Sequence, residues 1–208
     1  MLKLSRLNAI VDVDASERAG WDPVDLARAF VDGGATFLQI RAKQASSARL
    51  LDLALRIGEA VRPAEAMVIV NDRADVARLA GAGVHVGQDD LSPRDVRAVV
   101  GAAAIVGLST HTVEQMQAAV REPVSYVAIG PAFSTATKAT RYDAIGLETV
   151  RAAAEVAHAA GLPLVAIGGI TLARMRDVVD AGADAVAVIG DLLATGDPAG
   201  RVREYLRS

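Results

Sequence analysis

Short apolar runs alternate with segments of helical periodicity along the whole chain. Apolar runs that stop at a polar residue or a glycine are typical of parallel strands buried on both faces, and apolar residues spaced three or four apart predict amphipathic helices. The expected strands are residues 7–11, 36–41, 67–70, 84–86, 105–108, 126–129, 164–167 and 185–189. The expected helices are residues 22–34, 46–61, 75–82, 93–100, 113–120, 147–160, 172–181 and 198–206.

This alternation predicts an α/β fold, a single (βα)₈ TIM barrel that forms one domain over residues 1–208. A weak internal repeat supports it, because GGATFLQIR, AGAGVHVGQ and AGADAVAVIG each join a glycine-ended helix to a short strand and a polar or glycine turn. An open doubly wound sheet is the alternative. It is disfavoured because no Gly-x-Gly-x-x-Gly motif follows the first expected strand.

Residues 67–93 read as strand, helix and strand, with acidic residues after each strand. The carboxyl ends of parallel strands meet at one rim, so we expect Asp72 and Asp90 to lie together. Two carboxylates suit Mg²⁺, with a substrate phosphate supplying further ligands. Either aspartate could instead cap a helix. Ser92-Pro93 already supplies that cap after Asp90, which leaves Asp90 without a structural task, whereas Asp72 could still be a cap.

The end of the second expected strand carries an amide and two cations on one face. With a side-chain period of two, Gln39, Arg41 and Lys43 point one way, toward the barrel mouth, while Leu38 and Ile40 point toward the helices. Unpaired charges are too costly for a buried core, so these cations indicate a binding site. A solvated rim is the alternative interpretation.

The histidines do not indicate nucleophilic catalysis. His111 follows Ser109 where a helix begins, and it has no partner carboxylate in the sequence, so we interpret it as a surface residue. A hydroxyl in residues 109–112 could cap that helix. His85 lies inside a strand and is interpreted as a hydrogen-bonded core residue.

Two further strand ends suggest phosphate binding. In (βα)₈ barrels the loops after the last two strands often bind phosphate through backbone N–H groups, and Gly168-Gly169 and Ile189-Gly190 lie there. The loop of residues 130–145 is long for such a connection and carries Thr135, Thr137 and Lys138, as a binding loop or lid would; a merely disordered loop is the alternative interpretation.

Composition narrows the function classes. The 208 residues are 52% hydrophobic, contain no cysteine and carry a net charge of −3, which excludes disulfides and thiolate chemistry and argues against a nucleic-acid footprint. No apolar run approaches a membrane span, and the N-terminus lacks a signal-peptide pattern, so the cytoplasm is expected. Arginine outnumbers lysine 19 to three, yet Lys43 and Lys138 both fall at expected strand ends.

Six stretches, in register over residues 36–190, resemble the thiamine phosphate synthase family. They are Gln39-Ile40-Arg41-Ala42-Lys43, Val70-Asn71-Asp72-Arg73, the segment GVHVGQDD of residues 83–90, Ser109-Thr110-His111-Thr112, Thr135-Ala136-Thr137-Lys138 and Ala166-Ile167-Gly168-Gly169-Ile170.

The resemblance implies that the chain joins hydroxymethylpyrimidine diphosphate to hydroxyethylthiazole phosphate and releases pyrophosphate. It implies that Asp72 and Asp90 hold Mg²⁺, and that the reaction is a dissociative substitution. The residues implied for the pyrimidine and diphosphate are Gln39, Arg41, Lys43, Asn71, Ser109 and Lys138, of which Arg41, Lys43, Ser109 and Lys138 would be catalytic. Those implied for the thiazole phosphate are Thr135, Thr137, Gly169, Ile189 and Gly190, and Ile40, Ala42 and Ala136 complete the substrate-binding segments. The expected partners are these small molecules, without nucleic acid or membrane, and self-association into a homo-oligomer stays open.

The chain departs from the family at two places. Ser134 stands where the family often has proline, and Gly190 where it often has serine, which removes a hydroxyl from the phosphate cup. Two other functions compete. A related thiazole tautomerase would need an acid–base residue rather than two metal carboxylates, and a phosphate-ligand sensor would not need Arg41, Lys43 and Lys138 around a metal.

Overall fold

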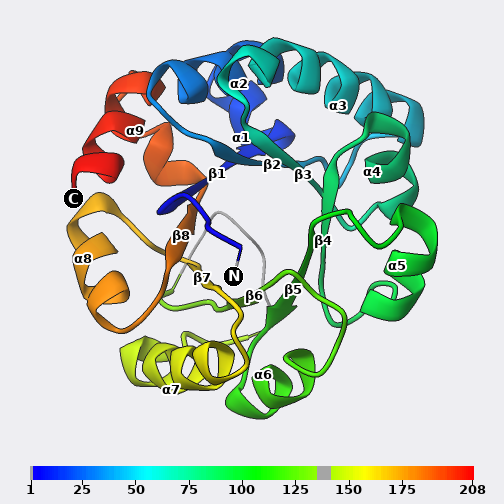
Figure 1. The fold of residues 1–208 in the computed structure, drawn as a ribbon. Coiled ribbons are helices and arrows are strands. Elements are labelled where there is room, and N and C mark those ends of the chain that lie inside the picture. Colours follow the sequence, from blue (N-terminus) through cyan, green and yellow to red (C-terminus); the bar gives the residue numbers. More distant parts are fainter. Residues whose placement is uncertain (1, 135–141) are drawn as a thin grey trace.

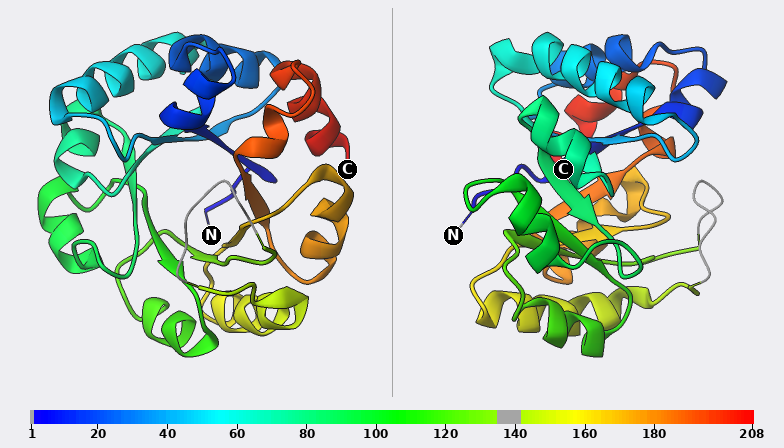
Figure 2. Two further views of the ribbon diagram at one scale, coloured as in Figure 1. Left: turned by 180° about the vertical axis from the view of Figure 1, so that it is seen from behind. Right: turned by 90° about the vertical axis from the view of Figure 1, so that its right-hand side faces the viewer.

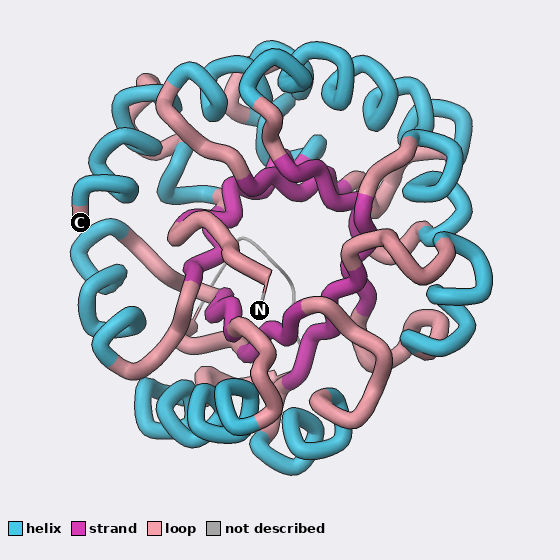
Figure 3. Tube along the Cα trace, in the orientation of Figure 1, coloured by secondary structure: helices cyan, strands magenta, loops and turns pink. Residues whose placement is uncertain are grey.

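The computed structural model describes residues 2–134 and 142–208. In this part of the chain eight parallel strands close into a barrel in sequence order, and the helices surround it (Figures 1 and 3). The strands are β1 (Leu7–Asp12), β2 (Phe37–Arg41), β3 (Met67–Asn71), β4 (Gly83–Val86), β5 (Val106–Thr110), β6 (Tyr126–Ile129), β7 (Leu164–Ile167) and β8 (Ala185–Val188). The predicted (βα)₈ barrel is therefore confirmed, with each strand within two residues of its expected bounds.

The α-helices between the strands also follow the predicted order. They are α1 (Val13–Arg18), α2 (Pro23–Asp32), α3 (Ser47–Val61), α4 (Ala74–Ala80), α5 (Pro93–Val100), α6 (Val113–Ala119), α7 (Gly146–Ala159), α8 (Leu172–Asp180) and α9 (Pro198–Arg207). Short 3₁₀ turns lie at η1 (Arg62–Ala64) and η2 (Gly190–Leu192). The pattern had not predicted α1 or the two 3₁₀ turns, because six residues or fewer are too few to show helical periodicity.

Alternate side chains of each strand face the barrel interior or the helices. Ile10, Gln39 and Ile69 are neighbours in register on β1, β2 and β3. Ile10 and Ile69 belong to the cluster inside the barrel, whereas Leu38 and Ile40 pack in the larger cluster under the helices. The predicted division of β2 into two faces is thus confirmed. Side chains on the inner face near the strand ends reach the mouth of the barrel.

The mouth is the end of the barrel where the strands finish, and the N-terminus lies at the other end (Figure 2). Within the described residues, no helix is both long enough and apolar enough to cross a membrane.

Candidate active site at the carboxyl ends of the strands

Three cavities meet at the barrel mouth, and Ser109 at the end of β5 lines all of them. The largest, of about 370 Å³, lies over the ends of β6, β7 and β8, and we call it the glycine cavity. The second, of about 170 Å³, includes Asp72 and Asp90 and is called the acidic cavity. The third, of about 30 Å³, lies inside the barrel and is called the inner cavity. Ser109 therefore stands between two cavities of different chemical character.

Asp72 lines the acidic cavity from a left-handed backbone conformation. Its φ is 65°, which is uncommon for a residue other than glycine, and its N–H donates to the carbonyl of His85 at 2.7 Å. Its carboxylate accepts from Lys43 Nζ at 2.5 Å. The alternative interpretation of Asp72 as a helix cap is wrong, since α4 begins at Ala74 and has no side-chain cap. Its side chain is directed to the cavity instead.

Asp90 faces the same cavity. The N–H of Gly87 donates to its carboxylate at 2.7 Å, so Asp90 closes the turn after β4. The expectation that Asp90 has no structural task is therefore wrong. Burial raises the pKa of Asp90, the bond from Gly87 lowers it, and the negative charge of Asp72 raises it further. Asp72 and Asp90 line one cavity, which confirms the predicted proximity of the two residues.

The acidic cavity suits a hard divalent cation. Its two close carboxylates repel each other, and a cation between them would relieve that repulsion. No group of three or more His, Cys, Asp or Glu side chains suited to a metal occurs among the described residues. A cation at Asp72 and Asp90 would thus complete its shell with water and substrate oxygens, as Mg²⁺ commonly does.

The polar residues of β2 reach three different surroundings. Gln39 is buried and lines the inner cavity. Arg41 pairs with Asp12 at the end of β1, and both side chains are largely buried. Lys43 is 46% exposed and pairs with Asp72. The solvated-rim alternative is therefore wrong for Gln39 and Arg41 and fits Lys43 only in part.

Asp12 is a site residue that the sequence analysis missed. One carboxylate oxygen accepts from the N–H of Ala15 at 2.9 Å and caps α1, while the other holds Arg41. The feature of the sequence that could have indicated this role is the position of Asp12 at the end of an apolar run. A helix of six residues shows no periodicity in the sequence, so nothing in the pattern marks Asp12 as its cap.

The inner cavity contains two buried polar atoms without a hydrogen-bond partner, Asn8 Oδ1 and Arg41 Nε, as far as the chain is described. Buried polar groups are normally satisfied, so such exceptions call for an explanation. Asn71, at the end of β3, lines both the inner and the acidic cavity. The inner cavity therefore offers hydrogen-bonding groups to a polar ligand.

A buried chain of hydrogen bonds leads from β6 to Ser109. Tyr126 Oη lies 2.9 Å from His85 Nδ1, and His85 Nε2 lies 2.8 Å from Ser109 Oγ. Gly107 makes room for it, because a Cβ there would lie 2.2 Å from the Tyr126 ring and 2.4 Å from His85 Nδ1. The interpretation of His85 as a hydrogen-bonded core residue is confirmed. Its contact with Ser109 also connects it to the site.

The predicted glycine pair after β7 lies in the glycine cavity. Gly168 and Gly169 have φ values of 101° and 62°, and a Cβ on Gly169 would lie 2.5 Å from the carbonyl oxygen of Ser134. The pair is thus required for close packing against the loop after β6. Ile189 and Gly190 line the same cavity, as the sequence predicted.

Asp191 ties this cavity to the C-terminal helix. Its Oδ2 accepts from the N–H of Leu172, from Nε and Nη2 of Arg201 at 3.1 and 2.9 Å, and from Tyr205 Oη at 2.7 Å. The negative charge of Asp191 is therefore neutralised by Arg201.

His111 precedes α6 as expected, but it is not a surface side chain. Its Nδ1–H donates to the carbonyl of Gly130 at 2.5 Å, and its ring stacks on Tyr142 with 3.7 Å between centroids. It lines both the glycine cavity and the acidic cavity. Thr112 is the residue that caps α6, by accepting from the N–H of Gln115.

The remaining predicted residues do not enter these cavities or lie outside the described part. The Ile40 side chain packs under the helices, because it is on the outer face of β2, and Ala42 packs beside the same cluster. Neither residue lines a cavity, so no side-chain contact to substrate is expected from them. Thr135, Ala136, Thr137 and Lys138, and with them the predicted lid, lie outside the described residues.

The comparisons with known proteins agree with this geometry. The family model for thiamine monophosphate synthase matches residues 7–192. The chain belongs to the thiamine monophosphate synthase family. It is 48% identical over 212 residues to the thiamine-phosphate synthase of Koribacter versatilis, covering 99% of this chain and 96% of that protein. It is 44% identical to the thiamine-phosphate synthase of Anaeromyxobacter dehalogenans, covering 86% of this chain and 79% of the relative.

A solved structure supports the family assignment. The thiamine phosphate pyrophosphorylase from Pyrococcus furiosus superposes with a TM-score of 0.86 at 28% identity and covers 98% of this chain and 94% of that one. The range matched by the family model includes Asp72, Asp90, Ser109 and Gly169. The resemblance on which the sequence analysis relied is confirmed.

Proposed function

We propose that the chain condenses hydroxymethylpyrimidine diphosphate with hydroxyethylthiazole phosphate to thiamine phosphate and pyrophosphate, with Mg²⁺ at Asp72 and Asp90. The main support for this proposal is that Ser109 lines both the acidic and the glycine cavity. A reaction between two phosphorylated molecules needs two anion sites that meet at the reacting atoms, and this position supplies that meeting point.

The acidic cavity would hold the diphosphate. Lys43 lines it and Arg41 lines the adjoining inner cavity, and each is held by a carboxylate, Asp72 for Lys43 and Asp12 for Arg41, which limits its motion. As the bond from carbon to the diphosphate oxygen breaks, negative charge grows on the leaving group, and preoriented cations stabilise it. When bound, Mg²⁺ would supply further charge neutralisation at the diphosphate oxygens.

The inner cavity would receive the polar edge of the pyrimidine. Asn8 Oδ1 and Arg41 Nε provide an acceptor and a donor that are otherwise unused among the described residues. Gln39 and Asn71 line the same cavity and add amide groups. These groups would fix the ring while its methylene carbon faces the thiazole nitrogen.

The chain's own residues would act by binding and orientation. The thiazole nitrogen is the nucleophile and the diphosphate is the leaving group, so no covalent bond to the protein is required. Ser109, held by His85, would direct a hydroxyl at the junction of the two substrates. The substrates are small phosphorylated molecules, and we expect the reaction in the cytoplasm.

An assay that separates synthase from tautomerase tests this proposal. The purified chain is given Mg²⁺ with pyrimidine diphosphate plus hydroxyethylthiazole phosphate, or with thiazole carboxylate phosphate alone, and the products are followed by ³¹P NMR. We expect thiamine phosphate in the first mixture and no isomerisation in the second. Isomerisation without thiamine phosphate in the first mixture would favour the tautomerase. A lack of conversion in both mixtures, with phosphate still bound, would favour the sensor.

A further inference from the structure

The glycine cavity has a cation that lies outside the six stretches that resemble the family. Arg174, on the first turn of α8, is the only lysine or arginine among the described residues that line this cavity. The other charged residue there, Asp191, is already paired with Arg201 at 2.9 Å. The charge of Arg174 is therefore left uncompensated in the cavity, for its described surroundings contain no carboxylate within ion-pair distance of it.

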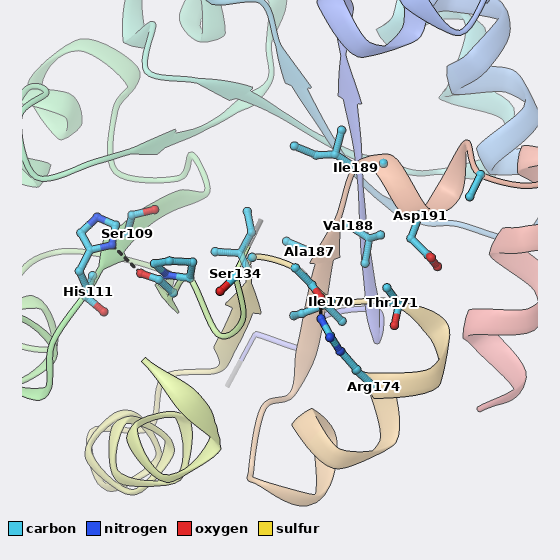
Figure 4. A pocket seen from close by; sticks show the side chains of 18 residues that line it. Ser109, His111, Ser134, Ile170, Thr171, Arg174, Ala187, Val188, Ile189 and Asp191 are labelled. Atoms are coloured by element: carbon cyan, nitrogen blue, oxygen red, sulfur yellow. Dashed lines mark hydrogen bonds between the residues drawn. The ribbon is translucent and has the colours of Figure 1, made fainter. Parts of the chain in front are cut away.

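The side chain of Arg174 is held in place by the loop itself. Its Nη1 donates to the carbonyl of Gly169 at 2.8 Å, and its guanidinium lies over the Phe133 ring, 4.6 Å from the centroid. Figure 4 shows it turned from α8 toward Ile170. These two contacts orient an exposed guanidinium without neutralising it. The other N–H groups of the Arg174 guanidinium have no hydrogen-bond partner among the described residues.

The described lining of this cavity provides backbone groups and hydroxyls such as that of Thr171, but no second cationic side chain. Gly169 and Gly190 lack side chains, so neither can offer a hydroxyl to a phosphate. A phosphate monoester carries up to two negative charges, and a planar guanidinium binds phosphate oxygens through paired, charge-assisted hydrogen bonds. An anchored arginine beside a glycine loop therefore supplies the charge that backbone N–H groups alone do not.

We propose that Arg174 is a binding residue for the phosphate monoester of the thiazole substrate, and that it selects the phosphorylated thiazole over its free alcohol. This inference rests on the proposed function, since it assigns the glycine cavity to that substrate. The phosphate lies between the guanidinium of Arg174 and the backbone of the Gly169 and Gly190 turns.

The test compares two arginines on one helix. Arg174→Ala removes the proposed contact, whereas Arg176→Ala removes an 86% exposed arginine of α8 that lines none of the cavities. Arg174→Ala should raise KM for thiazole phosphate about 10-fold or more, the effect of losing a charge-assisted hydrogen bond. The KM for pyrimidine diphosphate should stay within about twofold, and Arg176→Ala should resemble the wild type. Arg174→Lys should recover part of the affinity, because lysine keeps the positive charge but lacks the paired N–H donors of the planar guanidinium.

A merely structural role for Arg174 would give a different result. If the arginine only tied α8 to Gly169, the alanine variant would lower Tm and raise both KM values together. That result, or an unchanged KM for thiazole phosphate, would overturn the inference.

Calorimetric titration with inorganic phosphate keeps this test independent of synthase activity. Weaker phosphate binding in Arg174→Ala than in Arg176→Ala supports the site even if no thiamine phosphate is formed, in which case the proposed function fails alone. Equal phosphate affinity in the two variants overturns the role of Arg174.

Discussion

The phenol oxygen of Tyr126 lies within hydrogen-bond distance, 2.9 Å, of Nδ1 of His85 in the barrel interior. Burial raises the pKa of Tyr126, so the phenol keeps its proton. Because His85 is its hydrogen-bond partner, that proton is satisfied only if Nδ1 accepts it. Nε2 of His85 then carries the ring hydrogen and donates to Ser109 Oγ, which leaves the Ser109 hydrogen to donate into the cavities. Tyr126 thus determines the direction of the whole chain.

Tyr126→Phe should slow the reaction without weakening substrate binding. The phenyl ring keeps the packing but no longer specifies the tautomer of His85, so Ser109 loses its fixed direction. We expect kcat to fall about 10-fold, less than the roughly 100-fold loss for removing a donor outright in Ser109→Ala. Steady-state kcat and KM for both substrates provide the measurement.

The double variant separates this effect from a general loss of stability. If Tyr126 acts through Ser109, the pair Tyr126→Phe and Ser109→Ala should have the kcat of Ser109→Ala alone. If the fold losses in kcat of the two single variants multiplied in the double variant, Tyr126 would contribute to the reaction independently of Ser109. The unfolding free energy should fall by about 1–3 kcal/mol in Tyr126→Phe, because Nδ1 of a buried His85 loses its partner.

Two substitutions at Asp12 should distinguish its cap from its ion pair. Asp12→Asn can still cap α1 but leaves the buried guanidinium of Arg41 without a charged partner. We expect a higher KM for pyrimidine diphosphate and a loss of about 3 kcal/mol in unfolding free energy. Asp12→Ala should lose about 1 kcal/mol more, from the cap. If Asp12→Asn matched the wild type in both KM and urea denaturation, the ion pair would not position Arg41.

Asp90→Asn should remove the response of the protein to Mg²⁺. In the wild type, Mg²⁺ should raise Tm by binding between Asp72 and Asp90, and the variant should show no such shift. Folding raises the pKa of Asp90, so without metal its contribution to stability is greatest below its ordinary pKa and falls as pH rises through the raised value. Asp90→Asn should therefore be less sensitive to pH in that acidic range than the wild type. An equal Mg²⁺ shift in both proteins would refute the metal site.

Gly190→Ser should improve binding of the thiazole phosphate. Gly190 begins η2 and does not have a positive φ, so serine is compatible with the backbone. Its hydroxyl would face the cavity that Gly190 lines and donate to the phosphate. The KM for thiazole phosphate should fall about threefold to 10-fold, while the KM for pyrimidine diphosphate provides the internal control. An unchanged KM for thiazole phosphate would show that the absence of a hydroxyl at position 190 does not weaken binding of this substrate.

Local pattern predicted the barrel and the rim on which the site lies, since a strand such as β6 is recognisable from its own residues. It also predicted the inward face of β2, because Gln39 and Arg41 alternate with Leu38 and Ile40. Contacts that depend on side-chain rotamers or on short irregular segments could not be predicted from the sequence. Asp90 closes a turn on Gly87 that no periodicity indicates, and Asp12 reaches Arg41 across 29 residues.

The connection between Tyr126 and Ser109 shows the same limit. Their strands are neighbours, so proximity could be inferred from strand order. The hydrogen bonds run through His85, however, and depend on the space left by Gly107, which only the three-dimensional packing reveals.

The most direct test of the central claim is product stoichiometry under control of Mg²⁺. The purified chain is incubated with both phosphorylated halves, with either half alone, and with both halves plus a chelator, and thiamine phosphate and pyrophosphate are quantified together. We expect equal amounts of the two products, and only when both halves and Mg²⁺ are present. Thiamine phosphate formed at full rate in the chelator, or pyrophosphate released without thiamine phosphate, would contradict it.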